Sequence, residues 1–192
     1  MFTRQVKSGV SGRFRTPWGA GTVFVSEGRL VGVDLPLVSG SGIPSTLGGS
    51  AAPAGELGPP REPAPADRAA LNRWVGELES YFSGERLSWK AEDIPLEDLA
   101  VGRFERAVYG ALLSVPPGAT VSYGALAEMS GFPRAARAVG NAMAANAVPV
   151  VIPCHRVIRS DGSLGNYGND PAWKERLLAH EWEHAGPTGD GR

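Results

Sequence analysis

Hydrophobic and polar residues follow two different periods along this chain. Near the start, residues 14–35 contain two β-rich runs, 22–25 and 30–33, separated by Ser26-Glu27-Gly28-Arg29 with its turn glycine. From Asp67 onward the apolar residues recur every three or four positions, which is typical of helices that bury one face. The pattern therefore predicts a β-hairpin followed by a mainly helical region, an α+β chain.

The helical spacing predicts five helices, bounded by residues that start or break helices. The first begins with Asp67 as its N-cap and stops at Ser83-Gly84, and residues 95–100 form a connector to the second. The others cover, in order, 102–114, 123–129 with Thr120 and Ser122 as candidate caps, 134–145 with Pro133 in its first turn, and 171 to about 181.

The two helices at 123–129 and 134–145 are joined by a short turn, Ser130-Gly131-Phe132-Pro133, so they fit a helix-turn-helix unit. The second of them is almost bare, because most of its residues are alanine or glycine. This bareness suits either close packing against another helix or entry into a narrow groove with one long arginine projecting. The local pattern favours neither interpretation.

A change of composition divides the chain. In segment 39–66, twelve of 28 residues are Gly or Pro and few are charged, which predicts a disordered linker. We therefore expect a variable N-terminal domain over 1–100, a second domain over 101–183 and a flexible tail over 184–192. His180 and His184, at the end of the last helix, are expected to be solvated and to have no chemical role.

Charge and cysteine content narrow the function. The net charge of -1 predicts no bulk affinity for anionic surfaces, but bases outnumber acids eight to five between Arg103 and Arg176. A polyanion partner should therefore meet the C-terminal half. One cysteine excludes an intramolecular disulfide and a cysteine-rich zinc site, and we expect neither a metal nor a cofactor. The lack of a long apolar run predicts a cytoplasmic protein with no membrane partner.

The candidate chemistry lies at Pro153-Cys154-His155-Arg156, which contains the sole cysteine. An apolar run, residues 148–152, predicts a buried strand that ends at the thiol. A thiolate is a strong nucleophile, and a neighbouring imidazole can generate it if the chain turns at Pro153 so that both side chains face one way. The alternative is that Cys154 is only a small buried apolar residue.

These residues resemble the O6-alkylguanine-DNA alkyltransferases, also called methylated-DNA–protein-cysteine methyltransferases. The resemblance runs from about Phe104 to Glu181, and it rests on motifs at the family's places. They are Val121-Ser122-Tyr123, Arg134-Ala135-Ala136-Arg137-Ala138-Val139-Gly140, Asn146, Pro153-Cys154-His155-Arg156-Val157-Ile158, Gly165-Asn166-Tyr167 and the helix around Lys174-Glu175 and Glu181. For the N-terminal domain the resemblance implies a ribonuclease-H-like fold, here in a reduced form.

The resemblance implies a role for each matched residue. Cys154 would attack the alkyl carbon on guanine O6, while His155 takes the thiol proton through a water and Glu181 orients His155. Asn146 would hold the turn that carries the cysteine. Tyr123 would lie near the target phosphate and protonate the departing guanine. The implied DNA-binding residues are Arg137, Tyr123, Ala135, Ala136, Gly140 and Met143, and the implied base pocket consists of Val157, Tyr167, Gly168 and Pro149.

The implied partner is double-stranded DNA containing O6-alkylguanine, repaired by a monomer that is cytoplasmic, or nuclear in a eukaryote. Relatives that carry a serine at the Gly168 position or a basic residue at the Ala144 position would have contacts that this chain lacks. Two other functions stay open at this point. One is an alkylated-DNA-binding and signalling protein with little transfer activity, and the other is a cysteine hydrolase or acyltransferase.

Overall fold

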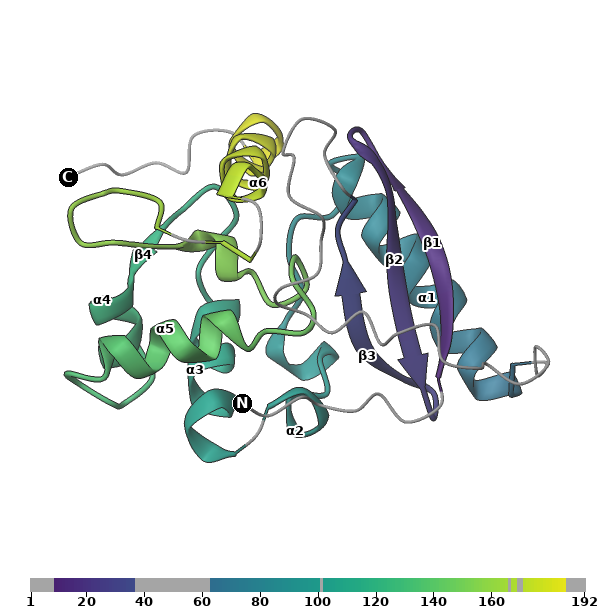
Figure 1. Cartoon of the computed structure of the whole chain (residues 1–192), viewed down its shortest axis with the longest axis horizontal. Coiled ribbons are helices and arrows are strands. Elements are labelled where there is room, and N and C mark those ends of the chain that lie inside the picture. Colours follow the sequence, from purple (N-terminus) through teal and green to yellow (C-terminus); the bar gives the residue numbers. More distant parts are fainter. Residues whose placement is uncertain (1–8, 37–62, 101, 166, 169–170, 186–192) are drawn as a thin grey trace. The chain divides into compact units, whose positions relative to one another are not determined.

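The computed structural model describes residues 9–36, 63–100, 102–165, 167–168 and 171–185. The chain divides into two units between Glu79 and Ser80 (Figure 1). The N-terminal unit holds a three-stranded sheet, and the C-terminal unit is mainly helical with one two-stranded sheet. This arrangement confirms the mixture of helix and small sheets that the sequence predicts.

The sheet of the N-terminal unit is antiparallel in the order β1-β2-β3, with β1 (Val10–Thr16), β2 (Gly19–Ser26) and β3 (Arg29–Asp34). The predicted hairpin is confirmed as β2 and β3, joined through Glu27 and Gly28 at positive φ. Strand β1 was not predicted, because its glycine and arginine residues weaken the apolar signal.

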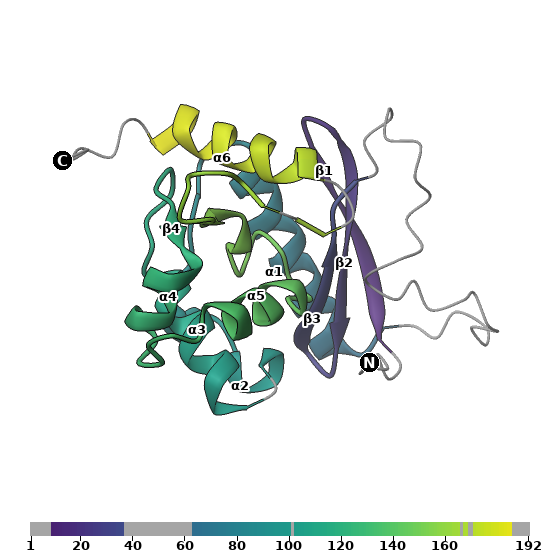
Figure 2. The ribbon, with the colours of Figure 1, turned by 60° about the vertical axis from the view of Figure 1, so that its left-hand side comes forward.

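Helix α1 (Pro65–Phe82) lies along one face of this sheet, as Figures 1 and 2 show. Its side chains meet the sheet at Gly12, which faces Leu71. The prediction of Asp67 as the N-cap is wrong, because α1 begins two residues earlier, at Pro65. The Asp67 carboxylate instead accepts a hydrogen bond of 2.6 Å from the Gly28 N–H in the hairpin turn.

Residues 37–62 of the predicted linker lie outside the described residues, as do residues 186–192 of the predicted tail. The linker prediction extends too far at its other end, since Pro65 and Ala66 belong to α1. The expected domain boundary at residue 100 also differs from the observed division. The chain after Glu79 belongs to the C-terminal unit because Tyr81 and Leu87 bond to buried side chains of that unit.

The C-terminal unit is built from helices, two 3-10 turns and one two-stranded sheet. Strands β4 and β5 pair in parallel through Val121–Val157 and Ser122–Ile158. The elements in chain order are η1 (Ala91–Asp93), α2 (Leu96–Leu99), α3 (Arg103–Leu113), β4 (Val121–Ser122), α4 (Tyr123–Met129), α5 (Ala136–Ala144), η2 (Cys154–Arg156), β5 (Val157–Ile158) and α6 (Pro171–Ala185).

Two helices of this unit follow the sequence prediction closely. Helix α3 buries Val108 and Leu112, and α4 is capped by the Ser122 hydroxyl, which accepts from the Ala125 N–H at 3.1 Å. The predicted connector at 95–100, by contrast, contains the short helix α2. Among the described residues, no helix is both long and apolar enough to cross a membrane.

Two other helices of this unit differ from the prediction. Helix α5 begins at Ala136 and not at Arg134, because Arg134 has a φ of 69°, which no right-handed helix accepts; Pro133 therefore precedes the helix. Helix α6 continues past Glu181 to Ala185, so residues 184 and 185 are helical rather than part of a tail.

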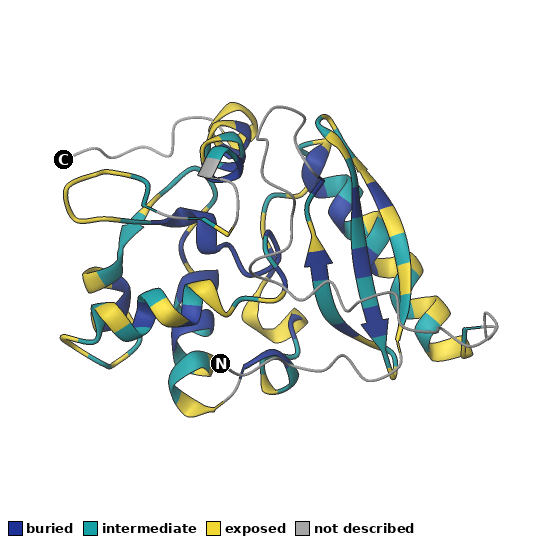
Figure 3. Cartoon of the chain, in the orientation of Figure 1, coloured by how far each residue is buried: buried dark blue, intermediate teal, exposed yellow. Residues whose placement is uncertain are grey.

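The apolar run before the cysteine is buried except at Pro149, but it is a turn and not a strand (Figure 3). Val150 has a φ of 75°, and the Ile152 N–H bonds back to the Val148 carbonyl at 3.0 Å. A left-handed β-branched residue is costly and persists only where its surroundings hold it. The buried turn thus gives the segment that carries the cysteine a rigid shape.

Candidate active site

Cys154 is the first residue of the 3-10 turn η2, so the chain turns at Pro153. The Asn146 side chain closes the loop that leads into η2. Its amide donates to the Ile152 carbonyl at 2.9 Å and to the Cys154 sulfur at 3.1 Å, and its oxygen accepts from the Val148 N–H at 3.0 Å. Asn146 therefore ties the start of the turn to both its end and the thiol.

The thiol is 7% exposed, and its burial raises the pKa of Cys154 above the ordinary thiol value. The hydrogen bond from Asn146, the nearby Tyr167 hydroxyl and the Lys174 charge oppose this effect without cancelling it. The thiol is therefore protonated at neutral pH and needs a base in order to react.

His155 is fully buried beside the cysteine, and its Nε2 lies 2.7 Å from Glu181 Oε1. Burial alone would raise the pKa of Glu181, but its hydrogen bonds with His155 and Arg156 and the Arg156 charge hold that pKa far below its usual value, so the carboxylate is ionised and can only accept. Nε2 must then donate, which leaves Nδ1 as an acceptor in the neutral ring. Nδ1 is buried, and it has no hydrogen-bond partner among the described residues.

Burial also lowers the pKa of His155, against the opposing effect of the Glu181 carboxylate. The ring is therefore neutral at physiological pH. A neutral imidazole with a buried acceptor nitrogen, one residue from a protonated thiol, has the properties of a general base.

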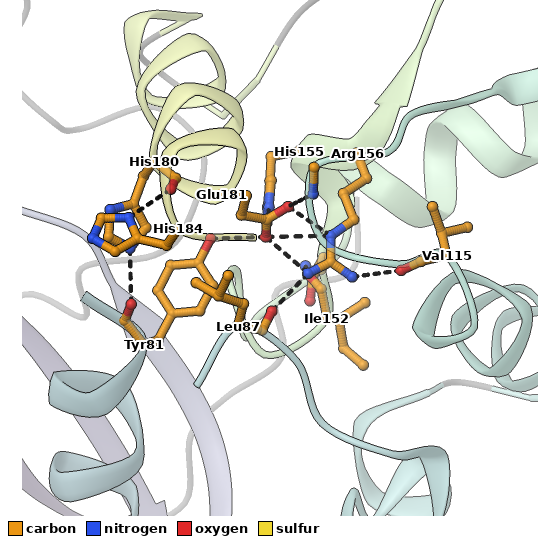
Figure 4. A network of polar contacts seen from close by, with 11 residues as sticks. Tyr81, Leu87, Val115, Ile152, His155, Arg156, His180, Glu181 and His184 are labelled. Atoms are coloured by element: carbon orange, nitrogen blue, oxygen red, sulfur yellow. Dashed lines mark hydrogen bonds and ion pairs between the residues drawn. The ribbon is translucent and has the colours of Figure 1, made fainter. Parts of the chain in front are cut away.

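Glu181 is the centre of a buried polar network, which Figure 4 shows. Besides His155, its carboxylate accepts from the Tyr81 hydroxyl at 2.9 Å and from the Gly118 N–H at 3.1 Å. Arg156 binds it through Nε at 3.0 Å and Nη2 at 2.8 Å. These donors come from α1, the loop after α3 and η2, so the network joins segments that are far apart in sequence.

Arg156 is itself 1% exposed, and its remaining donors reach the Val115 carbonyl at 2.6 Å and the Leu87 carbonyl at 2.8 Å. The carboxylate and the two carbonyls thus accept from four of the five N–H groups of this buried guanidinium. The sequence reasoning assigned no role to Arg156 or to Tyr81. Arg156 lies in the motif Pro153-Cys154-His155-Arg156-Val157-Ile158, whereas Tyr81 lies in the predicted amphipathic helix that stops at Ser83-Gly84.

The other sequence-predicted residues lie around η2 on several elements. Tyr123 opens α4, and its ring faces Gly140 of α5, while its hydroxyl faces Gly165. The Lys174 ammonium donates to the Val157 carbonyl and lies 6.0 Å from the centre of the Tyr123 ring. The predicted pocket residue Val157 is buried, Pro149 and Tyr167 are half-buried, and Gly168 is exposed with a φ of 47°.

One face of α5 and of the residue pair before it is open to solvent. Its exposed residues are Arg134, Arg137, Asn141 and Ala144, while Val139 and Ala142 are buried on the opposite side. The predicted DNA-binding residues Ala135, Ala136, Gly140 and Met143 are intermediate in exposure. The bare helix therefore packs closely on one side and presents a thin surface with a projecting arginine on the other.

The expectation of two solvated histidines is wrong for His180. This residue is 5% exposed, and its Nε2 donates to the Tyr81 carbonyl at 2.8 Å. His184 is exposed, and its Nδ1 donates to the His180 carbonyl. The difference arises because α6 continues past residue 181, which places His180 on the buried side of a helix.

Comparisons with known proteins agree on one family. The model of the family "6-O-methylguanine DNA methyltransferase, DNA binding domain" matches residues 103–183. A mouse protein named methylated-DNA–protein-cysteine methyltransferase is 50% identical over 111 residues, which cover 54% of this chain and 51% of the relative. A Mycobacterium tuberculosis protein of the same name is 41% identical over 119 residues, which cover 62% of this chain and 70% of the relative.

A comparison with solved structures points to the same family over a larger part of the chain. The crystal structure of Mycobacterium tuberculosis OGT in complex with DNA is similar with a TM-score of 0.65 and 32% identity, over 91% of this chain and 93% of that one. The chain spans about half the length of the mammalian relatives that it matches.

Proposed function

Because the chain belongs to the 6-O-methylguanine DNA methyltransferase family, we propose that it repairs DNA by moving an alkyl group from guanine O6 to Cys154. The observation that carries the proposal is the buried contact between His155 and Glu181, next to the only cysteine of the chain. This contact supports the proposal that His155 is the base for the thiol and that Glu181 orients it.

The reaction is a single displacement at the alkyl carbon. The Cys154 sulfur forms a bond to that carbon as the bond from the carbon to O6 breaks. The thiol proton passes to His155 Nδ1 through a water, and the departing guanine takes up one proton from the Tyr123 hydroxyl. Solvent then removes the extra proton from His155 and returns one to the Tyr123 phenolate, so the protons balance. Positioned proton transfers of this kind contribute factors of about 10²–10⁴ each.

The guanine must leave the duplex to reach a buried thiol. We propose that α4 and α5 act as a helix-turn-helix unit whose thin exposed face enters the minor groove, with Arg137 in the gap left by the flipped nucleotide. Asn146 would hold the reactive turn. The carbonyls of Cys154 and Val157 would read the guanine amine, while the amides of Tyr167 and Gly168 approach O6.

The N-terminal unit fits a reduced ribonuclease-H-like domain, with three antiparallel strands and one helix across them. We also propose that the protein acts as a monomer without a metal or cofactor, in the compartment that contains the DNA. The alternative of a binding and signalling protein with little transfer activity is less well supported, because the chain has the cysteine that transfer requires.

Incubation with a duplex containing O6-methylguanine tests the proposal. We expect the methyl group on Cys154, mapped by mass spectrometry of proteolytic fragments, and a plateau at one group per protein because a thioether is a poor leaving group. The unmodified duplex is the control. Repeated turnover, or binding without transfer, would refute the proposed function.

Replacing Arg137 by alanine should slow repair of duplex DNA by roughly 10–100-fold, because extrusion of a base costs a few kcal/mol that the arginine offsets. Reaction with free O6-benzylguanine should change little, since a free base needs no extrusion. The matched control is Arg106→Ala, which removes an exposed arginine from α3. Equal losses on both substrates would show that Arg137 serves the fold or the chemistry.

A further inference from the structure

Tyr81 stands at the last turn of α1, and its hydroxyl donates to Glu181 at 2.9 Å. The oxygen that accepts this bond is Oε1, which also accepts from His155 Nε2 at 2.7 Å. The two donors therefore share one carboxylate oxygen. The Tyr81 phenol, from outside the motif of residues 153–158, thus contacts the carboxylate that holds His155.

The Tyr81 ring is packed among aromatic side chains. Tyr81 is fully buried, its ring stacks on Trp89 at 6.0 Å, and Phe82 meets its ring at 5.1 Å in an edge-on arrangement. Its carbonyl accepts from His180 Nε2, so the main chain is tied to α6 beside Glu181 (Figure 4). Because this packing already fixes the Tyr81 ring, the hydrogen bond from its hydroxyl to Oε1 costs no further side-chain entropy.

The electrostatic effect of this bond on His155 has a definite sign. The charged or titratable groups that act on His155 are Glu181, Arg156 and Lys174, of which only Glu181 favours the protonated ring. Each hydrogen bond that the Glu181 carboxylate accepts disperses its negative charge and weakens its attraction for an imidazolium. The Tyr81 hydroxyl does so at the same oxygen that His155 uses.

We propose that Tyr81 is a positioning residue of the transfer reaction, whose hydroxyl fixes Glu181 Oε1 and weakens its hold on a protonated imidazole, so that His155 remains the neutral base. The inference rests on the proposed function. It assigns Tyr81 no contact with DNA or with the alkyl group. Tyr81, which lies outside the motif of residues 153–158, thereby influences the protonation state of His155.

The test is Tyr81→Phe, which removes only the hydroxyl. The rate of alkyl transfer should fall at acid pH as His155 protonates, and this acid limb should move to higher pH by about half a unit to one unit in the variant. The matched control is Tyr109→Phe, because the Tyr109 hydroxyl is also buried and donates to the Ala142 carbonyl at 3.0 Å. Both variants should lose similar thermal stability, but only Tyr81→Phe should move the limb.

A second readout does not depend on transfer. The chain has three histidines, so the ring signal of His155 can be assigned by its absence in His155→Gln and followed by NMR as the pH falls. We expect it to titrate at higher pH in Tyr81→Phe than in the wild type or in Tyr109→Phe. If the wild type transferred no alkyl group, the proposed function would fail while this titration still decided the role of Tyr81.

Two results would overturn the role of Tyr81. One is an acid limb that stays in place while stability falls as in Tyr109→Phe, which would make the tyrosine purely structural. The other is a His155 ring that titrates at the same pH in the wild type and in Tyr81→Phe. A ring that stays neutral in both proteins until acid unfolds them would also overturn it.

Discussion

The Cys154→Ala protein should transfer no alkyl group from O6-methylguanine in DNA. Cys154 is the only cysteine of the chain, and no other thiol can take its place as the nucleophile. DNA affinity should be nearly unchanged, because phosphate contacts and not the buried thiol supply most of the binding. Transfer is measured by methyl incorporation, and affinity by a filter or fluorescence assay at one fixed salt concentration.

The base provides the comparison. His155→Gln keeps the thiol and should lower the rate by roughly 10²–10⁴, the usual contribution of a general base, without abolishing transfer. Thermal melting of both variants checks that each is folded. Residual transfer by the alanine variant, with incorporation at another residue, would contradict the assignment of Cys154.

The Glu181→Leu protein should lose about 3–5 kcal/mol of unfolding free energy, the usual cost of leaving one partner of a buried ion pair alone. Arg156 would remain 1% exposed with only the Val115 and Leu87 carbonyls as acceptors. Urea unfolding at neutral pH measures the loss. The matched control is Glu183→Leu, which changes an exposed glutamate two residues further along the same helix.

The double variant Arg156→Met with Glu181→Leu should recover much of this loss, since a buried pair replaced by apolar residues is often neutral in stability. Losses that simply add in the double variant would show that the two side chains do not act as a pair. The pH dependence follows from the low pKa of Glu181. Its stabilisation is complete above the ordinary glutamate value of 4.5 and is lost only as the pH falls below it.

The position of the reactive thiol shows where local pattern fails. The apolar residues 148–152 have the composition of a buried strand, and all of them except Pro149 are buried. Yet Val150 is left-handed, because Asn146 and the Ile152 N–H close a turn around it. Apolar composition predicts burial well, but it cannot reveal a backbone conformation that neighbouring side chains impose.

The start of α5 shows the same limit on a smaller scale. The alanine-rich run and Pro133 predict a helix from residue 134. Arg134 instead adopts a φ of 69°, and the helix begins at Ala136. Helix type and approximate length follow from propensity, whereas the first residue depends on how the turn meets α4.

The sequence by itself determined the amphipathic helices α1, α3 and α4, the hairpin of β2 and β3, and the place of the lone cysteine next to a histidine. These features are local, so periodicity and residue chemistry reveal them. Only the tertiary structure decided that Tyr81, Gly118 and Arg156 meet on Glu181. Their positions are far apart in the chain, and nothing in the local pattern of a buried tyrosine or arginine says which carboxylate will accept its hydrogen bond.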